Sequence, residues 1–387
     1  MPADRWLGVG SCGAAQERAG ARAVDDALIH DDPKLLIVFC SPAHDLRELL
    51  RQIRERAGDA PLIGCTTAGE ITTAGPSDAS VVVTALGGSG FAVRTAVATE
   101  VSGNLREAGA HVARSLPDRA DLPHKVVLLL SDGLAGDQQE VVRGAHGVLG
   151  AAVPLVGGCA GDDLKMRRTF QLYADHVQSD SLVAAGIASN APLGIGVRHG
   201  CRRVGEPMVV TSSRGNRVRT LDDQPALDAY LKRLGASEPA HQDQEGLTRL
   251  ALTRPLGLGR PNGADQVCFI GGADFAERSL SCIAEVPQGA LVWIMESDAR
   301  SALEATEAAC GDSLAALGGR RPLGLIAFDC IGRRSVLGEE GLRSETDRLA
   351  AMAAGAPVAG FCTYGEIART RGVRGFHNHA LAVLSVG

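Results

Sequence analysis

An eleven-residue segment recurs along the chain: Pro61-Leu-Ile-Gly-Cys-Thr-Thr-Ala-Gly-Glu-Ile71. Its second copy is Pro357-Val-Ala-Gly-Phe-Cys-Thr-Tyr-Gly-Glu-Ile367, and six of the eleven positions are identical. A shortened third copy reads Pro154-Leu-Val-Gly-Gly-Cys-Ala-Gly-Asp162. A sequence that resembles itself in this way indicates a fold assembled from repeated structural units.

The residues in front of each copy predict a strand followed by a helix. Leu35–Cys40 is a short, wholly apolar run, which is typical of a strand buried on both faces. In Asp45–Arg56 the leucines and the isoleucine recur at the spacing of an amphipathic helix. The same order precedes the other two copies, with strands at Val126–Leu130 and Leu323–Phe328 and helices at Gln138–Leu149 and Gly341–Ala354. The sequence therefore predicts an α/β fold built from strand-helix-strand units.

We expect two related α/β halves around a shared cleft, because two of the units lie in the first half of the chain and one in the second. Further runs predict antiparallel strands: a hairpin of Val81–Leu86 with Phe91–Val97, and a meander of Thr169–Tyr173, Ser181–Ala188 and Gly194–Arg198. Residues 235–266 are polar and rich in Gly and Pro, which predicts a loop or linker.

The composition excludes several classes of protein. The 387 residues carry a net charge of −6 and only 3% of them are aromatic, so we expect no nucleic-acid surface. None of the ten cysteines stands in a C-x-x-C motif, which argues against a zinc ribbon or redox dithiol and favours a reducing cytoplasm over secretion. The N-terminus lacks the apolar segment of a signal peptide, and every apolar run is too short to cross a membrane. We therefore expect a cytoplasmic protein that does not bind membranes.

The repeat also places polar residues where a ligand is expected to bind. In a strand-helix-strand unit the loops after both strands lie at the same edge of the sheet, and open α/β sheets bind their ligands at that edge. The candidate ligand-binding residues are those that follow the predicted strands: Cys65, Thr66, Thr67, Gly69, Glu70, Ser131, Asp132, Gly158, Cys159, Gly161, Asp162, Thr363, Tyr364, Gly365 and Glu366.

Three acids, Glu70, Asp162 and Glu366, share one place in the aligned repeats. Such a carboxylate could bind an ammonium group of a ligand, while free N–H groups of the glycine turns could hold a carboxylate. The combination suits a zwitterion such as an amino acid. The alternative is that each acid accepts hydrogen bonds from its own loop. The sequence leaves both interpretations open.

Three other motifs bear on catalysis, metal binding and nucleotide binding. Cys65, Cys159 and Cys362 lie beside the turns, but a nucleophilic thiolate needs a base, and no histidine stands at a recognisable spacing, so small buried cysteines are the simpler interpretation. His377 and His379 form an H-x-H pair that would share one face of a strand, and two imidazoles alone do not make a metal site. Gly8-Val-Gly-Ser-Cys-Gly13 has the spacing G-x-G-x-x-G but not the context of a dinucleotide-binding site.

Taken together, the motifs resemble the FIST sensory domain family. The resemblance rests on Pro61–Ile71, Val153–Asp163, Gly200–Pro207 with Val209–Thr211, Phe361–Ile367 and Phe376–Asn378, and it extends from about Leu7 to the C-terminus. It implies an N-terminal FIST part over residues 1–220 and a C-terminal part over 221–387. It also implies an intracellular signal-input domain that binds a small ligand, with amino acids as one proposed class.

Some members that this chain resembles are haem-binding nitric-oxide sensors that act on a histidine kinase. His199, at a predicted strand end between glycine-containing segments, is the first candidate for an axial haem ligand, because neutral imidazole commonly ligates iron. We recognise no kinase or DNA-binding segment, so we expect a stand-alone sensor that signals through a partner protein. The hypotheses are therefore a non-enzymatic small-ligand sensor, a haem-based gas sensor, and a cleft enzyme with a cysteine nucleophile.

Overall fold

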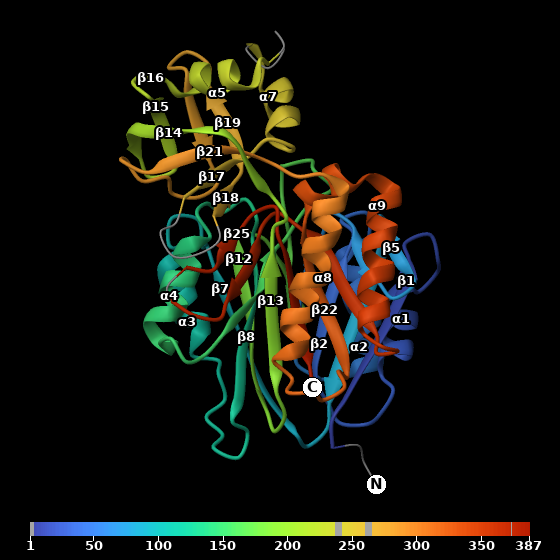
Figure 1. Cartoon of the computed structure of the whole chain (residues 1–387). Helices are drawn as coiled ribbons and strands as arrows, with labels where there is room; N and C mark the ends of the chain where they lie inside the picture. Colours follow the sequence, from blue (N-terminus) through green and yellow to red (C-terminus); the bar gives the residue numbers. More distant parts are fainter. Residues whose placement is uncertain (1–3, 237–241, 260–264, 373) are drawn as a thin grey trace.

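Three α/β units follow one another along the chain, and each contributes most of one six-stranded sheet. The computed structural model describes residues 4–236, 242–259, 265–372 and 374–387. Every unit has the same order of elements: strand, helix, strand, helix, strand, short hairpin, strand. We call the three units together the body. Residues 202–296 interrupt the third unit and form an antiparallel insert that stands at one end of the body (Figure 1).

The elements of the body are as follows. The first unit contains β1 (Trp6–Gly13), α1 (Ala19–Ala27), β2 (Pro33–Cys40), α2 (Leu46–Ala57), β3 (Leu62–Thr66), β4 (Glu70–Thr72), β5 (Gly75–Ser77) and β6 (Ser80–Gly87). The second contains β7 (Phe91–Thr99), α3 (Leu105–Ala113), β8 (His124–Ser131), α4 (Gln139–Leu149), β9 (Leu155–Cys159), β10 (Gln171–Tyr173), β11 (His176–Gln178) and β12 (Ser181–Ser189). The third contains β13 (Leu193–Arg198), α8 (Ala299–Ala315), β22 (Gly324–Cys330), α9 (Ile331–Met352), β23 (Val358–Thr363), β24 (Glu366–Arg369), β25 (Phe376–His377) and β26 (Leu381–Val386).

Each unit gives its short hairpin to the sheet of another unit. β4 pairs with β23, β24 pairs with β9 and β10 pairs with β3, always antiparallel. The exchange closes a ring, because the first unit gives to the third, the third to the second and the second to the first. The three sheets consequently have equivalent strand orders: β1-β6-β2-β3-β10-β11, β7-β12-β8-β9-β24-β25 and β13-β26-β22-β23-β4-β5.

The repeated glycine of the segment allows this pairing. Gly64 lies so close to its neighbouring strand that an added Cβ would be 2.5 Å from the carbonyl oxygen of Val38. At Gly360 the corresponding distance to the carbonyl oxygen of Ala327 would be 2.2 Å. Only glycine therefore fits between the parallel strands at this position.

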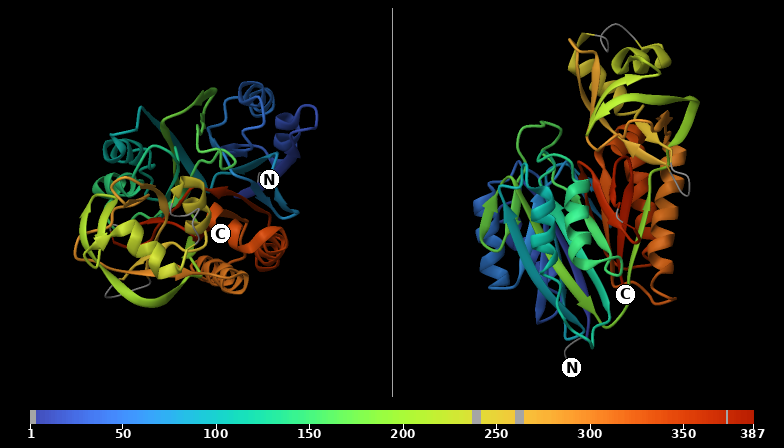
Figure 2. Two further views of the ribbon diagram at one scale, coloured as in Figure 1. Left: turned by 90° about the horizontal axis from the view of Figure 1, so that it is seen from above. Right: turned by 90° about the vertical axis from the view of Figure 1, so that its left-hand side faces the viewer.

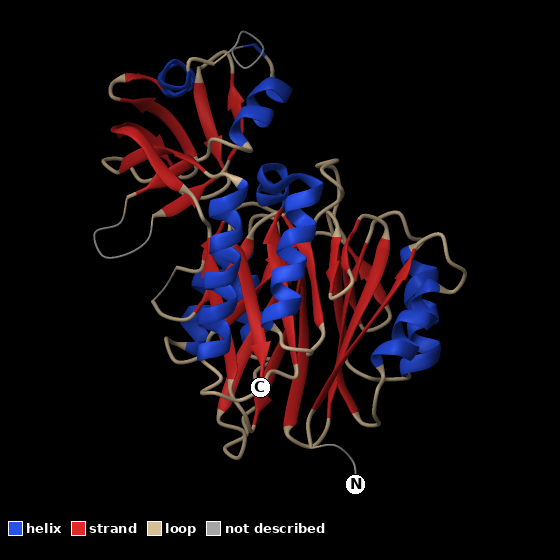
Figure 3. Cartoon of the chain, turned by 45° about the vertical axis from the view of Figure 1, so that its right-hand side comes forward, coloured by secondary structure: helices blue, strands red, loops and turns tan. Residues whose placement is uncertain are grey.

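The strands β2, β8 and β22 run parallel to β3, β9 and β23, which confirms the predicted strand-helix-strand units and the α/β class. Successive residues of β2 point to opposite faces of the sheet. Leu36 and Val38 pack under α1 and α2, whereas Ile37 and Phe39 point into a core shared by all three sheets. The helix pairs α1/α2, α3/α4 and α8/α9 cover the outer faces (Figures 2 and 3).

Three phenylalanines pack against one another in the shared core. The ring centroid of Phe39 lies 4.6 Å from that of Phe361 and 6.2 Å from that of Phe328, and all three residues are fully buried. Phe39 comes from the first unit and the other two from the third. Replacing one of these phenylalanines by alanine would lower the free energy of unfolding by about 3–5 kcal/mol, so the cluster stabilises the contact between the first and third units.

The insert is built around an antiparallel sheet of its own. It contains β14 (Arg202–Arg214), β15 (Arg217–Leu221), β16 (Gln224–Pro225), α5 (Ala226–Leu234), α7 (Gln244–Ala251), β17 (Leu256–Leu258), β18 (Gln266–Cys268), β19 (Ile270–Asp274), β20 (Ser279–Cys282) and β21 (Leu291–Glu296). Its helices pack on its sheet through Leu227, Tyr230 and Leu247, all fully buried. Two chain crossings, β13 to β14 and β21 to α8, connect it to the body.

Three details of the sequence prediction were wrong. β6 and β7 do not form a hairpin, because β6 is paired on both edges by β1 and β2, and β7 pairs with β12 in another sheet. The predicted meander strands β10, β12 and β13 are antiparallel to their neighbours but lie in three different sheets. Of the predicted loop 235–266, residues 237–241 and 260–264 lie outside the described residues, and the rest includes α7 and β17.

Two further predictions can be compared with the fold. The glycines of the G-x-G-x-x-G segment lie in β1, where a Cβ on Gly8 or Gly10 would collide with backbone oxygens of α1, so these two glycines serve helix packing. Within the described ranges, no helix is both long enough and apolar enough to cross a membrane.

Candidate functional site

A cavity of about 530 Å³ lies where the insert meets the body. Its walls on the body side come from the end of β22, from β25, from the segments after β8, β9, β22 and β23, and from the turn between β25 and β26: Gly133, Leu134, Gly136, Gln138, Leu164, Met166, Cys330, Ile331, Gly332, Tyr364, Phe376, Asn378 and His379. The insert contributes Asn216, Gln244, Thr248, Leu252, Phe269, Gly271, Cys282 and Ile283. The cavity therefore lies at the carboxyl ends of parallel strands, where α/β proteins bind ligands.

The turn after β9 is held at the cavity by Asp162. The carboxylate of Asp162 accepts hydrogen bonds from the backbone N–H groups of Met166, Arg167 and Arg168 at 2.7–2.9 Å, and from the phenol of Tyr364 at 2.5 Å. Burial alone would raise the pKa of Asp162, but these hydrogen bonds outweigh it and hold the pKa below its usual value. Asp162 thus acts on the shape of the loop that brings Leu164 and Met166 to the cavity.

Asp132 fixes the next loop in the same manner. Its carboxylate accepts from the backbone N–H groups of Leu134 and Asp180, each at 2.9 Å. The side-chain nitrogen of Gln138 donates to the carbonyl oxygen of Asp132 at 2.9 Å. The side-chain oxygen of Gln138 is buried and has no partner among the described residues, although Gln138 lines the cavity.

His379 lines the cavity from the third unit. It is 1% exposed, and neither of its ring nitrogens has a hydrogen-bond partner within the described residues. A Cβ at Gly332 would lie 2.7 Å from the imidazole, and the ring centroid of Phe269 is 6.0 Å away. Burial, with the nearby charge of Arg333, lowers the pKa of His379 to about 3, so the imidazole is neutral.

The expected H-x-H strand is not formed. His377 ends β25, and its Nε2 lies 2.9 Å from the carbonyl oxygen of Ala368, whereas His379 has a φ of 52° and lies beyond the strand. The left-handed turn sends the two imidazoles to different surroundings. Sequence reasoning singled out this pair but missed that His379 alone enters the cavity.

Glu70 and Glu366 occupy equivalent places, but their counterpart in the second unit is Gln171 rather than Asp162. The strand registers place Glu70 opposite Phe361, Glu366 opposite Gly158 and Gln171 opposite Cys65, which are equivalent positions of the repeat. The alignment of Asp162 with the two glutamates was therefore wrong. The second unit has a longer loop at this point, which moves the equivalent position further along the chain, to Gln171.

Both glutamates are buried and hydrogen-bonded within their own units. Glu366 accepts from Thr363 Oγ1 at 2.5 Å and from the backbone N–H of Ala380 at 3.1 Å. Glu70 accepts from the side chain of Thr67 and from the backbone N–H and hydroxyl of Ser80. Burial raises the pKa of Glu70 to about 7 and that of Glu366 to about 8. Neither lines the cavity.

The structure brings the three repeat turns together, as a ring of backbone hydrogen bonds. Ala68 N donates to Cys362 O, Cys159 N donates to Gly365 O, and Gly161 N donates to Thr66 O, at 2.8–3.0 Å. The residues predicted as ligand contacts in these turns are buried: Cys65, Thr66, Thr67, Glu70, Ser131, Gly158, Cys159, Gly161, Thr363 and Gly365. Gly69 is also buried, with a φ of 122° that suits glycine. Of all the predicted contacts, Tyr364 alone appears in the cavity wall.

The three cysteines beside the turns are fully enclosed. Burial raises the pKa of Cys65, Cys159 and Cys362 well above that of a free thiol. A thiol in such surroundings is protonated and a poor nucleophile. No cluster of three or more potential metal ligands occurs in the described part of the chain.

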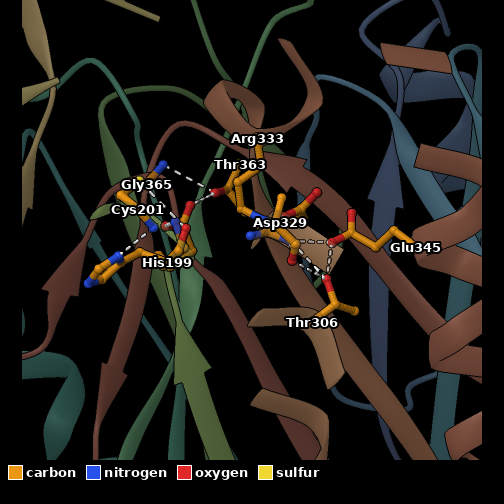
Figure 4. A network of polar contacts seen from close by, with 11 residues as sticks. His199, Cys201, Thr306, Asp329, Arg333, Glu345, Thr363 and Gly365 are labelled. Atoms are coloured by element: carbon orange, nitrogen blue, oxygen red, sulfur yellow. Dashed lines mark hydrogen bonds and ion pairs between the residues drawn. The ribbon is translucent and has the colours of Figure 1, made fainter. Parts of the chain in front are cut away.

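His199 lies in the link between β13 and β14. Its Nδ1 accepts a hydrogen bond from Cys201 N at 3.0 Å (Figure 4), and burial lowers its pKa. It does not line the cavity. Among the described histidines, His379 is therefore the one that faces the cavity.

A buried ion network, which sequence reasoning missed, lies beneath the turns. Arg333 donates to Asp329 at 2.7 Å and to Thr306 at 2.8 Å, and it also pairs with Glu345 (Figure 4). All four residues are at most 1% exposed. Burial raises the pKa of Asp329 well above its usual value, and the charge of Glu345 raises it further. The spacing of Asp329 and Arg333, four residues apart, was the available signal.

The chain matches a described family and several curated relatives. The family model for the FIST N domain matches residues 34–224, and that for the FIST C domain matches residues 226–369. An uncharacterised protein of Mycobacterium tuberculosis strain H37Rv is 26% identical over 392 residues, covering 96% of this chain and 97% of that protein. An uncharacterised protein of Mycobacterium bovis is 26% identical over 389 residues, covering 96% of each. An uncharacterised protein of Methanocaldococcus jannaschii is 27% identical over 154 residues, so this chain spans 30% of that protein's length.

Proposed function

The chain belongs to the FIST family, whose domains are sensory, and we propose that it is a signal-input protein whose small-molecule ligand binds in the cavity between the body and the insert. The observation that carries this proposal is the position of the cavity, which has walls from both parts. Its volume of about 530 Å³ falls in the range of small-molecule sites, roughly 300–1,000 Å³.

A ligand in this position can act on the arrangement of the two parts. Phe269 of the insert lines the cavity, and its backbone N–H donates to Asn378 Oδ1 of the body at 3.2 Å. A ligand that contacts both walls favours the arrangement in which both walls are close, and it shifts the population only by its preference for that arrangement. The changed position of the insert would then be the signal.

The output is a partner protein that reads this change, and a histidine kinase is one class of partner. We propose that the protein senses its ligand in the reducing cytoplasm, because all ten cysteines are free thiols and nine of them are buried. The absence of charged residues from the described cavity wall supports a ligand that is taken up as a neutral molecule.

A second candidate ligand is haem, and one observation favours it. His379 offers an unpartnered neutral imidazole inside a largely apolar cavity, and imidazole nitrogen is a common axial ligand of haem iron. His199 fits less well, because its Nδ1 accepts a hydrogen bond from Cys201 N and it does not line the cavity. A Soret band that appears on adding haemin and is lost in His379→Ala, but kept in His199→Ala, would support this candidate.

A thermal-shift screen of small metabolites tests the main proposal. The plug variant Thr248→Trp places an indole in the cavity from α7, and Arg249→Trp introduces the same side chain at the neighbouring exposed position. A cavity ligand should stabilise the wild type and Arg249→Trp but not Thr248→Trp. A ligand that stabilises the plug variant equally well binds elsewhere, and that result would contradict the proposal.

A further inference from the structure

The described wall of the cavity carries no formal charge. Its residues are apolar side chains such as Leu134, Phe269 and Ile331, glycines, and uncharged polar groups. An ion that enters such a site loses its hydration without gaining an opposite charge, and that loss opposes binding. The wall therefore favours a neutral ligand.

The acids next to the cavity are already occupied. Both oxygens of Asp132 accept backbone N–H groups, and the carboxylate of Asp162 accepts three of them and the phenol of Tyr364. Glu366 is satisfied by Thr363 and Ala380. None of these carboxylates is free to hold the ammonium group of a zwitterion.

The buried cation near the cavity is occupied as well. Arg333 is enclosed by Asp329, Glu345 and Thr306, and it is not part of the cavity wall. It donates hydrogen bonds to both carboxyl groups and to Thr306 within the body. Because Arg333 does not line the cavity, it is not placed to hold the carboxylate of a ligand there.

Two buried polar side chains of the wall do lack a partner among the described residues. They are the side-chain oxygen of Gln138, which is 2% exposed, and the imidazole of His379, which is 1% exposed. They come from different units, at the N-terminal end of α4 and in the turn between β25 and β26. Buried groups of this kind are nearly always hydrogen-bonded in native proteins, so each requires a partner from outside the described residues, either an ordered water or a bound molecule.

We propose that the cavity binds an uncharged, largely apolar compound that donates a hydrogen bond to Gln138 and exchanges a second one with His379. The inference rests on the proposed function and names the ligand class of that site. Neutral cyclic amides and heteroaromatic compounds with an N–H group have this chemistry, whereas free amino acids do not. Neutral imidazole can either donate or accept, so the second hydrogen-bonding group of the ligand can be of either kind.

A series of indoles that differ in charge tests the proposal by calorimetric titration of the full chain. The probes are indole-3-acetamide, which is neutral, indole-3-acetate, tryptamine and tryptophan. We expect the amide to bind at least about tenfold more tightly than each charged probe. Equal binding of a charged probe, or no binding of the amide at millimolar concentration, would overturn the ligand class.

Variants test the two hydrogen-bonding side chains. Gln138→Leu and His379→Leu should each weaken binding of the amide by about tenfold, the loss expected when a buried polar partner is removed. His111→Leu, on the exposed surface of α3, is the matched control and should bind as the wild type does. Unchanged affinity in both cavity variants would overturn the proposal.

A change on the ligand avoids relying on variants that fail to fold. The N,N-dimethyl amide of 1-methylindole-3-acetic acid lacks every N–H donor, and it should bind the wild type more weakly than indole-3-acetamide does. If it binds equally well, the proposed hydrogen bonding is wrong. Titration of Thr248→Trp separates the two proposals: undiminished binding there contradicts the cavity itself, whereas lost binding there with equal affinity for charged probes contradicts only the ligand class.

Discussion

The phenol of Tyr364 donates a hydrogen bond of 2.5 Å to the carboxylate of Asp162, although the two residues belong to different units of the body. Tyr364 follows β23, and Asp162 follows β9. Because Asp162 also holds the backbone of residues 166–168, this contact links the third unit to the loop that carries Leu164 and Met166. The shape of one cavity wall therefore depends on a contact between units.

Replacing Tyr364 by phenylalanine should loosen this link. A hydrogen bond to a charged group contributes about 1.5–3 kcal/mol, so Tyr364→Phe should lower the free energy of unfolding by that amount, measured with urea. Tyr173→Phe is the matched control, because Tyr173 donates only a long hydrogen bond of 3.4 Å to Thr95 O. Equal effects of the two substitutions would show that the Asp162 contact has no special weight.

Glu366 should make the protein less stable as the pH rises. Its pKa is about 4.3 in an unfolded chain and about 8 in the fold, so the fold prefers the protonated form. The stabilisation is complete below the unfolded pKa and is lost as the pH rises through the folded pKa, with a slope of up to about 1.4 kcal/mol per pH unit. Denaturation of Glu366→Gln between pH 5 and 8, roughly the span of the two pKa values, should give a flatter curve than the wild type.

The second unit provides a natural precedent for this substitution, because Gln171 occupies the equivalent place. Glu70→Gln should flatten the curve as well, and the double variant should flatten it most. An unchanged slope in Glu366→Gln would mean that this carboxyl is ionised in the folded protein.

Arg333 should be the most costly charge to remove. Arg333→Met leaves the buried carboxyls of Asp329 and Glu345 without a counter-charge, and we expect a loss of about 3–5 kcal/mol in the free energy of unfolding. Arg51→Met, which removes exposed ion pairs on α2, should cost far less, because solvent screens exposed charges. Similar losses in chemical denaturation would contradict the structural role of the buried network.

Maleimide labelling of the folded protein should reach Cys201 before any other cysteine. Cys201 is the most exposed of the ten thiols, and burial still raises its pKa to about 11, so labelling should be slow near neutral pH. Mass spectrometry of tryptic peptides, with Cys201→Ser as the control, would identify the labelled site. Rapid labelling of Cys65, Cys159 or Cys362 would revive the hypothesis of a cysteine nucleophile.

The sequence predicted the units correctly because their signals are local. The apolar run at Leu35–Cys40 and the helical spacing after it depend only on neighbouring residues, and β2 and α2 formed there. The exchange of hairpins could not be predicted, since β4 pairs with a strand almost 300 residues further along the chain. Strand periodicity indicates which face is buried but not which edge is paired.

The site was predicted only in part, for a similar reason. The repeats indicated correctly that three turns meet, but their polar groups bond one another rather than lining the cavity. Gln171 was missed because it lies 14 residues after Gly157, whereas Glu70 lies six residues after Gly64. Gln138 was missed, and His379 was considered only as part of an H-x-H pair, because burial without a partner is a property of the folded chain.

Hydrogen exchange of the full chain with and without indole-3-acetamide tests most directly whether a ligand joins the two parts. Bound at saturation, the amide should slow exchange both in residues 133–138 of the body and in residues 244–252 of the insert, because both segments contribute to the cavity wall. Slowed exchange in both segments, absent from Thr248→Trp, is the predicted result. Saturating binding that leaves exchange in either segment unchanged would contradict the account.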